Sequence, residues 1–94
     1  LASFIVSGSD QQKTLGTAKE LHDLFAARPE VQEFQLFGPA PASLEKINER
    51  YRFQLMLKMP DFATLTRVTR EVCRQLRKPG DTRLSIDINP FFML

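Results

Sequence analysis

Cysteine and histidine are almost absent from this 94-residue chain, which contains one residue of each. The single cysteine, Cys73, has no partner within the chain and therefore excludes an internal disulfide. One cysteine and one histidine also cannot complete a zinc site by themselves. The lack of disulfides is typical of proteins in a reducing compartment, and we expect this protein in the cytoplasm.

Long apolar runs are missing as well. No stretch approaches the ~20 apolar residues that a membrane-spanning helix needs, so we expect no membrane contact. The segment Leu1–Val6 is apolar but short and has no basic flank, which predicts a strand rather than a signal peptide. Because strand-like sequence starts at Leu1 without a polar lead-in, we interpret the chain as a piece of a longer protein, although a trimmed start would give the same pattern.

Neither basic nor acidic residues are in large excess. The chain has 13 Lys and Arg against 11 Asp and Glu, which gives a net charge of +2. This balance permits a local basic patch that contacts nucleic acid but does not demand one. With 43% hydrophobic and 26% charged residues, the composition is that of an ordinary globular protein, and its length predicts one domain over residues 1–94.

Catalytic motifs are not found. The glycines in Gly8–Asp10 and Phe37–Pro39 lack the Gly-Lys-Ser/Thr ending of a phosphate-binding loop. His22 borders an apolar helical stripe without a partner motif, which favours a boundary histidine over a catalytic base. Cys73 follows an apolar residue in a predicted helix, which favours an inert thiol. We therefore expect no catalytic residue, metal site or cofactor in this chain.

The most informative stretch is 50–59, in which apolar and polar residues alternate strictly. One face predicts a core contribution from Tyr51, Phe53, Leu55, Leu57 and Met59. The other face carries three cations and an amide among Arg50, Arg52, Gln54, Met56 and Lys58. Before this strand, Gly38–Ser43 is interpreted as a rigid turn that leads into a short basic connector.

Three further strands and two helices are predicted. The strands are residues 1–7, 31–37 and 83–89, the last with Leu84, Ile86 and Ile88 facing inward. A capping box of Ser9 and Gln12 predicts a helix to about Ala27. Its apolar stripe comprises Leu15, Ala18, Leu21, Leu24 and Phe25.

A cap at Asp61 predicts the second helix, which we expect to end near Arg77. Its apolar stripe comprises Phe62, Leu65, Val68, Val72 and Leu76. The resulting order, βαββαβ, predicts an α+β ferredoxin-like fold in which two helices cover one face of a four-stranded antiparallel sheet.

The basic strand supplies the candidate DNA-binding site, which comprises Lys46, Arg50, Arg52, Gln54 and Lys58. Arg and Lys can neutralise phosphates without reading sequence, and the amide can donate or accept a hydrogen bond. An alternative stays open, in which Arg52 faces Glu33 or Asp87 in exposed cross-strand pairs worth only ~0.2–1 kcal/mol.

Two other features are candidates for docking on a partner or another domain. The second helix carries Arg67 and Arg70, followed by Arg74, Arg77 and Lys78, along one outer side. A solvated helix face is the favoured interpretation, and contact with nucleic acid or an acidic partner is the alternative. The apolar tail Phe91, Phe92, Met93 and Leu94 either folds under the sheet or docks on another domain or subunit.

Three motifs in order resemble the C-terminal domain of primosomal protein N′, a bacterial replication-restart DNA helicase. They are the turn Gly38–Ala42, the strand Arg50–Lys58 and the closing Ile86–Pro90, and the opening Leu1–Gly8 is also similar. The resemblance covers essentially the whole chain. Two positions depart from the family pattern: Asn89 replaces a second Asp, and Phe62 stands where some members carry a basic residue linked with binding an acidic tail.

The resemblance implies a parent protein that is an ATP-dependent 3′-to-5′ DNA helicase, uses Mg and ATP, and binds zinc in a separate insertion. That protein recognises stalled or branched forks and restarts replication in the bacterial cytoplasm. This chain would be its accessory DNA-binding and docking domain. The implied partners are single-stranded or forked DNA, the helicase lobes of the same chain, single-strand DNA-binding protein and other primosome proteins.

Two alternatives to DNA binding by this chain remain. In the first, the chain is a protein-interaction module that braces the helicase lobes or binds the acidic tail of single-strand DNA-binding protein without touching DNA. In the second, it is a stand-alone RNA-binding sheet. The second is disfavoured because the Gly-aromatic-Gly/Ala-aromatic signature is missing around Arg52 and Phe53.

Overall fold

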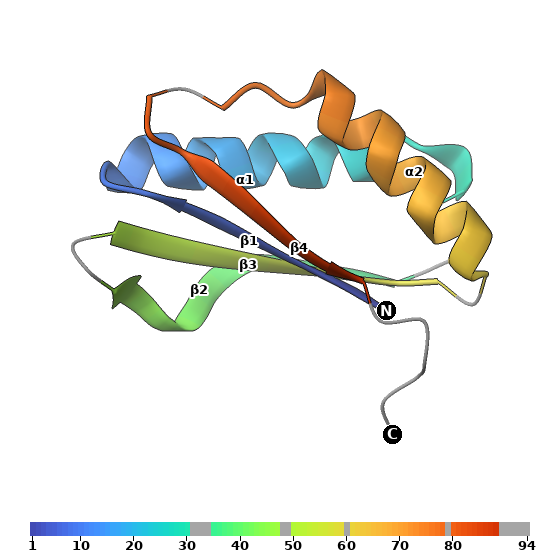
Figure 1. The fold of residues 1–94 in the computed structure, drawn as a ribbon, viewed down its shortest axis with the longest axis horizontal. Coiled ribbons are helices and arrows are strands. Elements are labelled where there is room, and N and C mark those ends of the chain that lie inside the picture. Colours follow the sequence, from blue (N-terminus) through green and yellow to red (C-terminus); the bar gives the residue numbers. More distant parts are fainter. Residues whose placement is uncertain (31–34, 48–49, 60, 79, 89–94) are drawn as a thin grey trace.

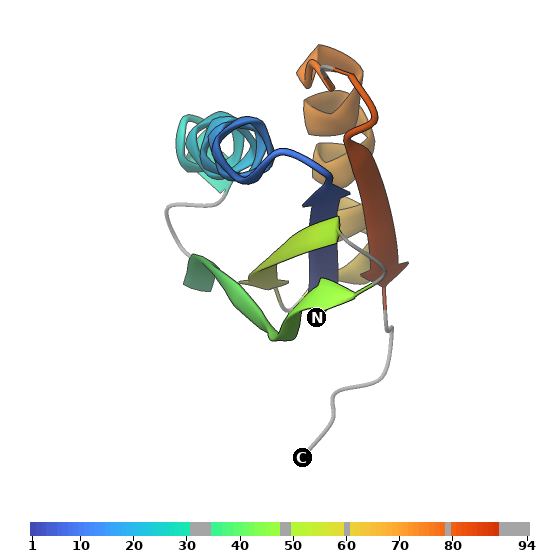
Figure 2. The ribbon, with the colours of Figure 1, turned by 90° about the vertical axis from the view of Figure 1, so that its left-hand side faces the viewer.

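The computed structural model describes residues 1–30, 35–47, 50–59, 61–78 and 80–88. Its elements are β1 (Ala2–Gly8), α1 (Gln11–Ala26), β2 (Gln35–Ile47), β3 (Arg50–Lys58), α2 (Phe62–Gln75) and β4 (Arg83–Ile88). All strand pairs are antiparallel, and the strand order is β2-β3-β1-β4. Both helices lie on the same side of the sheet (Figures 1 and 2). The predicted α+β fold with a ferredoxin-like arrangement is therefore confirmed.

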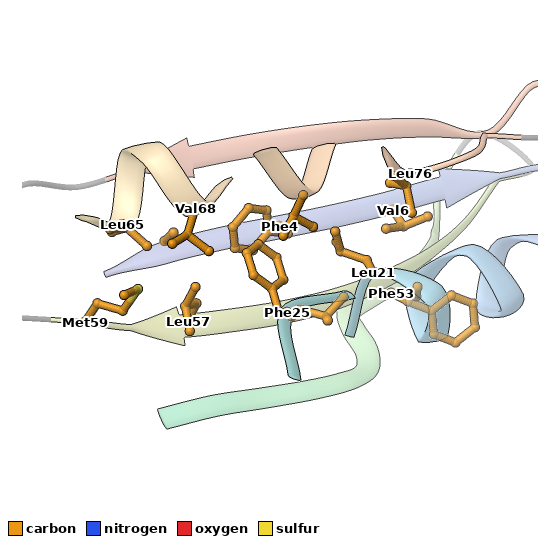
Figure 3. Packing of buried hydrophobic residues seen from close by; sticks show 14 residues of the cluster. Phe4, Val6, Leu21, Phe25, Phe53, Leu57, Met59, Leu65, Val68 and Leu76 are labelled. Carbon is orange, nitrogen blue, oxygen red and sulfur yellow. The ribbon is translucent and has the colours of Figure 1, made fainter. Parts of the chain in front are cut away.

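The core lies between the sheet and the two helices. Strand β3 contributes Phe53, Leu55 and Leu57 to it, as its alternation predicts, and Tyr51 packs at the edge. The rings of Phe4 on β1 and Phe25 on α1 lie 5.1 Å apart between their centroids, and they meet between the layers (Figure 3). Burial of each such side chain contributes roughly 1.5–3 kcal/mol, which fixes one face of every strand toward the helices.

Two residues that the apolar patterns assigned to the core are exposed. Phe62 is 46% exposed at the first position of α2, and Ile86 is 43% exposed on the helix-facing side of β4. A residue at a helix end or on an edge strand has packing neighbours on fewer sides than one in the middle of an element. Periodicity alone therefore overestimates the burial of both side chains.

The cap of α1 also differs from the prediction. Asp10, rather than Ser9, is the N-cap, and its carboxylate accepts a hydrogen bond of 2.9 Å from the backbone N–H of Lys13. The backbone N–H of Ser9 instead donates to Oδ1 of Asp81. A carboxylate caps well because it accepts from a free N–H and carries negative charge at the positive end of the helix dipole. The predicted cap of α2 at Asp61 is confirmed.

Strand β2 runs through the segment that was predicted to be a turn. It extends over Gly38–Ser43 to Ile47, with register shifts between Phe37 and Ala40 and between Pro41 and Lys46. Since β2 is an edge strand, its prolines remove no hydrogen bond from a second neighbour, and bulges absorb the irregularity. The predicted first part of this strand, 31–34, lies outside the described residues. Among the described helices, none has the length and apolar character needed to cross a membrane.

Candidate functional site

The face of the sheet opposite the helices, called the open face below, is covered by no element among the described residues (Figure 2). Because directly opposed residues of antiparallel strands point to the same face, the register sorts this surface into rows. The first row comprises Phe37, Met56, Ser3 and Asp87. The second comprises Ala40, Gln54, Ile5 and Ser85, and the third comprises Arg52, Ser7 and Arg83.

Two exposed cations stand on the open face in addition to Arg52. Lys58 lies at the end of β3 opposite Gln35, and Arg83 lies opposite Ser7 at the start of β4. Neither side chain forms a hydrogen bond or ion pair with another residue in the part of the chain that the structure describes. Lys58 was predicted, whereas Arg83 was missed. The alternation of Arg83 with Ser85 and Asp87 was the signal that could have found it.

Arg50 is held by the protein itself. Its Nη1 donates to Oδ2 of Asp81 at 3.0 Å, and its Nη2 donates to the carbonyl oxygens of Asp81 and Ser7 at 2.9 and 3.0 Å. The side chain is only 20% exposed. The backbone N–H of Ser9 and the Arg50 guanidinium hold the pKa of Asp81 below its usual value. Arg50 therefore connects β3 with the end of β1 and with the loop before β4.

Two other residues of the predicted DNA-binding site are Gln54 and Lys46. Gln54 is half-buried, and its Nε2 donates to Oγ of Ser3 at 2.9 Å. The backbone of Lys46 pairs with that of Tyr51. The structure describes only the backbone in this part of β2. The register therefore gathers Arg52, Gln54 and Lys58 on one surface.

The register also tests the alternative cross-strand pairs. Asp87 lies in the row of Ser3 and Met56, two rows away from Arg52, so the two are not directly opposed. Glu33 lies outside the described residues. The direct opposition of Arg52 and Asp87 is thus wrong, because β1 lies between β3 and β4 and each of these strands pairs with β1 instead of with the other.

An aromatic residue on the open face was missed as a site residue. Phe37 on β2 is 52% exposed and lies directly opposite Met56. Phe37 is two residues from Gln35 and therefore lies on the same, polar face of the strand. This spacing was the signal in the sequence that could have identified it. The next residue, Gly38, has φ of +97°, and a Cβ atom there would lie 2.5 Å from the carbonyl oxygen of Gln54. Only glycine fits this close approach of β2 to β3.

Of the two docking candidates on α2, Arg67 forms ion pairs within the chain and Arg70 is exposed. Nη1 of Arg67 donates to Oε2 of Glu30 at 3.1 Å and lies 3.8 Å from Oε1 of Glu71. Arg28 also pairs with both carboxylates, which ties the end of α1 to α2. Arg70 is exposed and has no such contact with a described residue. The tail Phe91–Leu94 lies outside the described residues.

The described residues offer little for covalent or metal chemistry. No group of three or more His, Cys, Asp or Glu among them could hold a metal ion. Burial raises the pKa of the Cys73 thiol, which opposes its activation as a nucleophile. His22 is a boundary residue, with its Nδ1 3.1 Å from Oδ1 of Asp23.

Sequence comparisons agree with one another. A family model described as the primosomal protein N C-terminal domain matches residues 1–91. Replication restart protein PriA of Haemophilus influenzae is 33% identical over 72 residues, which are 76% of this chain and 10% of that protein. The protein of the same name in Synechocystis is 38% identical over 60 residues, which are 60% of this chain and 6% of that protein. In Treponema pallidum, the identity is 24% over 94 residues, which are 100% of this chain and 14% of that protein.

The family model covers nearly the whole chain, whereas the chain spans only 6% to 14% of the length of these relatives. The match thus concerns one small part of much longer proteins. It includes the open face, since all four strands lie within residues 1–91. The chain belongs to the family of primosomal protein N C-terminal domains.

Proposed function

We propose that this chain is an accessory DNA-binding and docking domain of a replication-restart helicase. The observation that carries the proposal is the open face, on which Lys58 and Arg83 are exposed and engage no described side chain. The replication setting rests on the family and on relatives that are named replication restart proteins. ATP, Mg and zinc would belong to parts of the parent protein outside this chain.

The chemistry of the open face fits a phosphate backbone. Lys and Arg neutralise phosphates and release counterions, which gives affinity without sequence specificity. Each neutralised phosphate of a single strand contributes about 0.7 to the slope of log K against log salt. Arg52 lies in the same row as Arg83, and Lys58 lies further along β3, so the cations are spread over the face.

A second candidate function is docking of a protein partner on the helix side. Two exposed apolar side chains favour it, Phe62 at the start of α2 and Ile86 on edge strand β4. Arg70 on the same helix would complement an acidic partner, such as the tail of single-strand DNA-binding protein or a lobe of the helicase. This function uses a different surface and can coexist with DNA binding.

Fluorescence anisotropy of this chain with labelled single-stranded and forked DNA across a salt series tests the proposal. Binding that weakens steeply with salt supports a DNA site within the chain. A parallel titration with an acidic peptide that ends in apolar residues tests the second candidate. Absence of DNA binding at low salt overturns the first function, and peptide binding in that case favours docking alone.

A further inference from the structure

Phe37 is the most exposed large apolar side chain among the described residues. Its inward neighbour on β2, Leu36, packs against the core, so the strand already has its apolar anchor at this point. The aromatic ring of Phe37 is therefore not needed to hold β2 in place. An exposed aromatic ring on a sheet face is a surface that can bind the flat face of another ring.

The backbone fixes where this ring lies. Phe37 is paired with Met56 on β3, and the next residue is Gly38, whose approach to the Gln54 carbonyl leaves no space for a side chain. Met56 supplies a polarizable thioether beside the ring. The ring is thus held on a paired strand, next to an apolar neighbour, rather than on a free loop.

The charges around Phe37 favour an anionic ligand. Lys58 lies two residues from Met56 along β3, about 7 Å away, and faces the same side. Asp87 shares the row of Phe37, but three strand spacings separate them, which is about 14 Å. The ring of Phe37 therefore lies nearer to the cation Lys58 than to Asp87, the one charged residue of its own row. A ligand that combines a flat ring with a phosphate fits this arrangement.

We propose that Phe37 stacks on one unpaired base of a DNA strand whose adjoining phosphate is bound by Lys58. The inference rests on the proposed function, and it specifies the ligand as single-stranded DNA. In a duplex both faces of each base are covered by neighbouring bases, so only an unpaired base offers a face to the ring. Stacking on an aromatic side chain tolerates any base, which agrees with a site that binds without reading sequence.

The test uses Phe37→Ala and, as a matched control, Phe62→Ala, which removes an exposed ring from the helix side. Labelled oligo-dT of about 12 nucleotides and a duplex of equal length are the probes. Phe37→Ala should bind oligo-dT roughly 5- to 100-fold more weakly and the duplex within about 2-fold of the parent chain. Phe62→Ala should bind both probes as the parent does. Thermal unfolding verifies that each variant is folded.

A second variant, Phe37→Trp, reports the contact directly because the chain contains no other tryptophan. Its affinity for oligo-dT should be retained, and its emission should be quenched at saturation with oligo-dT and not with duplex. Unquenched emission at saturation, or equal losses of both probes in Phe37→Ala, would overturn the inference. A blue shift of the tryptophan emission that grows with protein concentration in the absence of DNA would also overturn the inference. It would show that the side chain at position 37 contacts a second copy of the chain.

If the parent chain binds neither probe at low salt, the proposed DNA-binding function and the stacking inference both fail. If the parent binds oligo-dT in a salt-dependent manner and Phe37→Ala binds equally well, the stacking inference alone is overturned.

Discussion

Arg50 at the start of β3 reaches Asp81 in the segment before β4, with 3.0 Å between Nη1 and the carboxylate Oδ2. The same guanidinium donates to the carbonyl of Ser7 at the end of β1. A residue that local sequence marks as a phosphate ligand thus joins three separate segments of the fold. The exposed positive charge of the open face lies instead on Lys58 and Arg83, and Arg52 beside them is half-buried.

Replacing Arg50 should cost stability. Arg50→Gln removes charge-assisted hydrogen bonds to Asp81 and leaves the Ser7 carbonyl short of a donor, so we expect a loss of about 1–3 kcal/mol in the free energy of unfolding. Lys58→Gln is the control on the same strand, and we expect it within about 0.5 kcal/mol of the parent. Urea unfolding measures both values. Equal stability of the two variants would contradict the structural role of Arg50.

Alanine substitutions at Gly38 and Gly16 should have opposite effects on stability. Gly38→Ala places a Cβ 2.5 Å from the Gln54 carbonyl at a φ of +97°, so we expect it to destabilise the chain by about 1–3 kcal/mol. Gly16→Ala is the control, since it lies within α1 with open space around it and should stabilise by roughly 0.5–1 kcal/mol. Thermal unfolding of the two variants should shift in opposite directions, and a shift of the same sign for both would contradict this reading of β2.

Asp61 should make stability depend on pH. Its carboxylate accepts hydrogen bonds from the Thr64 hydroxyl and from the backbone N–H of Ala63, which hold its pKa below the usual value of 3.8. The unfolded chain therefore takes up a proton first as the pH falls. The stabilisation is complete well above pH 3.8 and is lost as the pH falls through the folded pKa.

Two variants of Asp61 test this pH dependence. Asp61→Asn retains a capping side chain but cannot titrate, so its stability should fall less than that of the parent between pH 7 and pH 3. Asp61→Ala loses the cap at every pH and should be about 0.5–2 kcal/mol less stable at pH 7. Urea unfolding at both pH values gives these differences. An equal acid loss in Asp61→Asn and the parent chain would exclude this contribution.

The fold could be predicted from the sequence because its patterns are local. The alternation of 50–59 and the helical stripe from Leu65 to Leu76 each identify one buried face. The course of β2 through Pro39 and Pro41 could not be predicted in this way. It depends on pairing with β3 at the edge of the sheet, where a missing N–H is tolerated.

The site was only partly predictable for a related reason. Alternation shows which side chains of β3 share a face, and it identified Arg52, Gln54 and Lys58. It does not show what lies opposite them on strands distant in sequence. The engagement of Arg50 by Asp81, 31 residues away, and the position of Phe37 beside Met56 depend on tertiary register.

The central claim is that the open face, rather than the helix side, contacts DNA. The most direct measurement compares the salt dependence of oligo-dT binding for two doubly neutralised variants. Lys58→Gln with Arg83→Gln removes exposed cations of the open face, and Lys13→Gln with Lys19→Gln removes the same charge from exposed positions of α1. The first variant should lower the steepness of log K against log salt by about 1.4, which corresponds to two phosphate contacts, and the second should leave it unchanged. Equal slopes for the two variants would contradict the account.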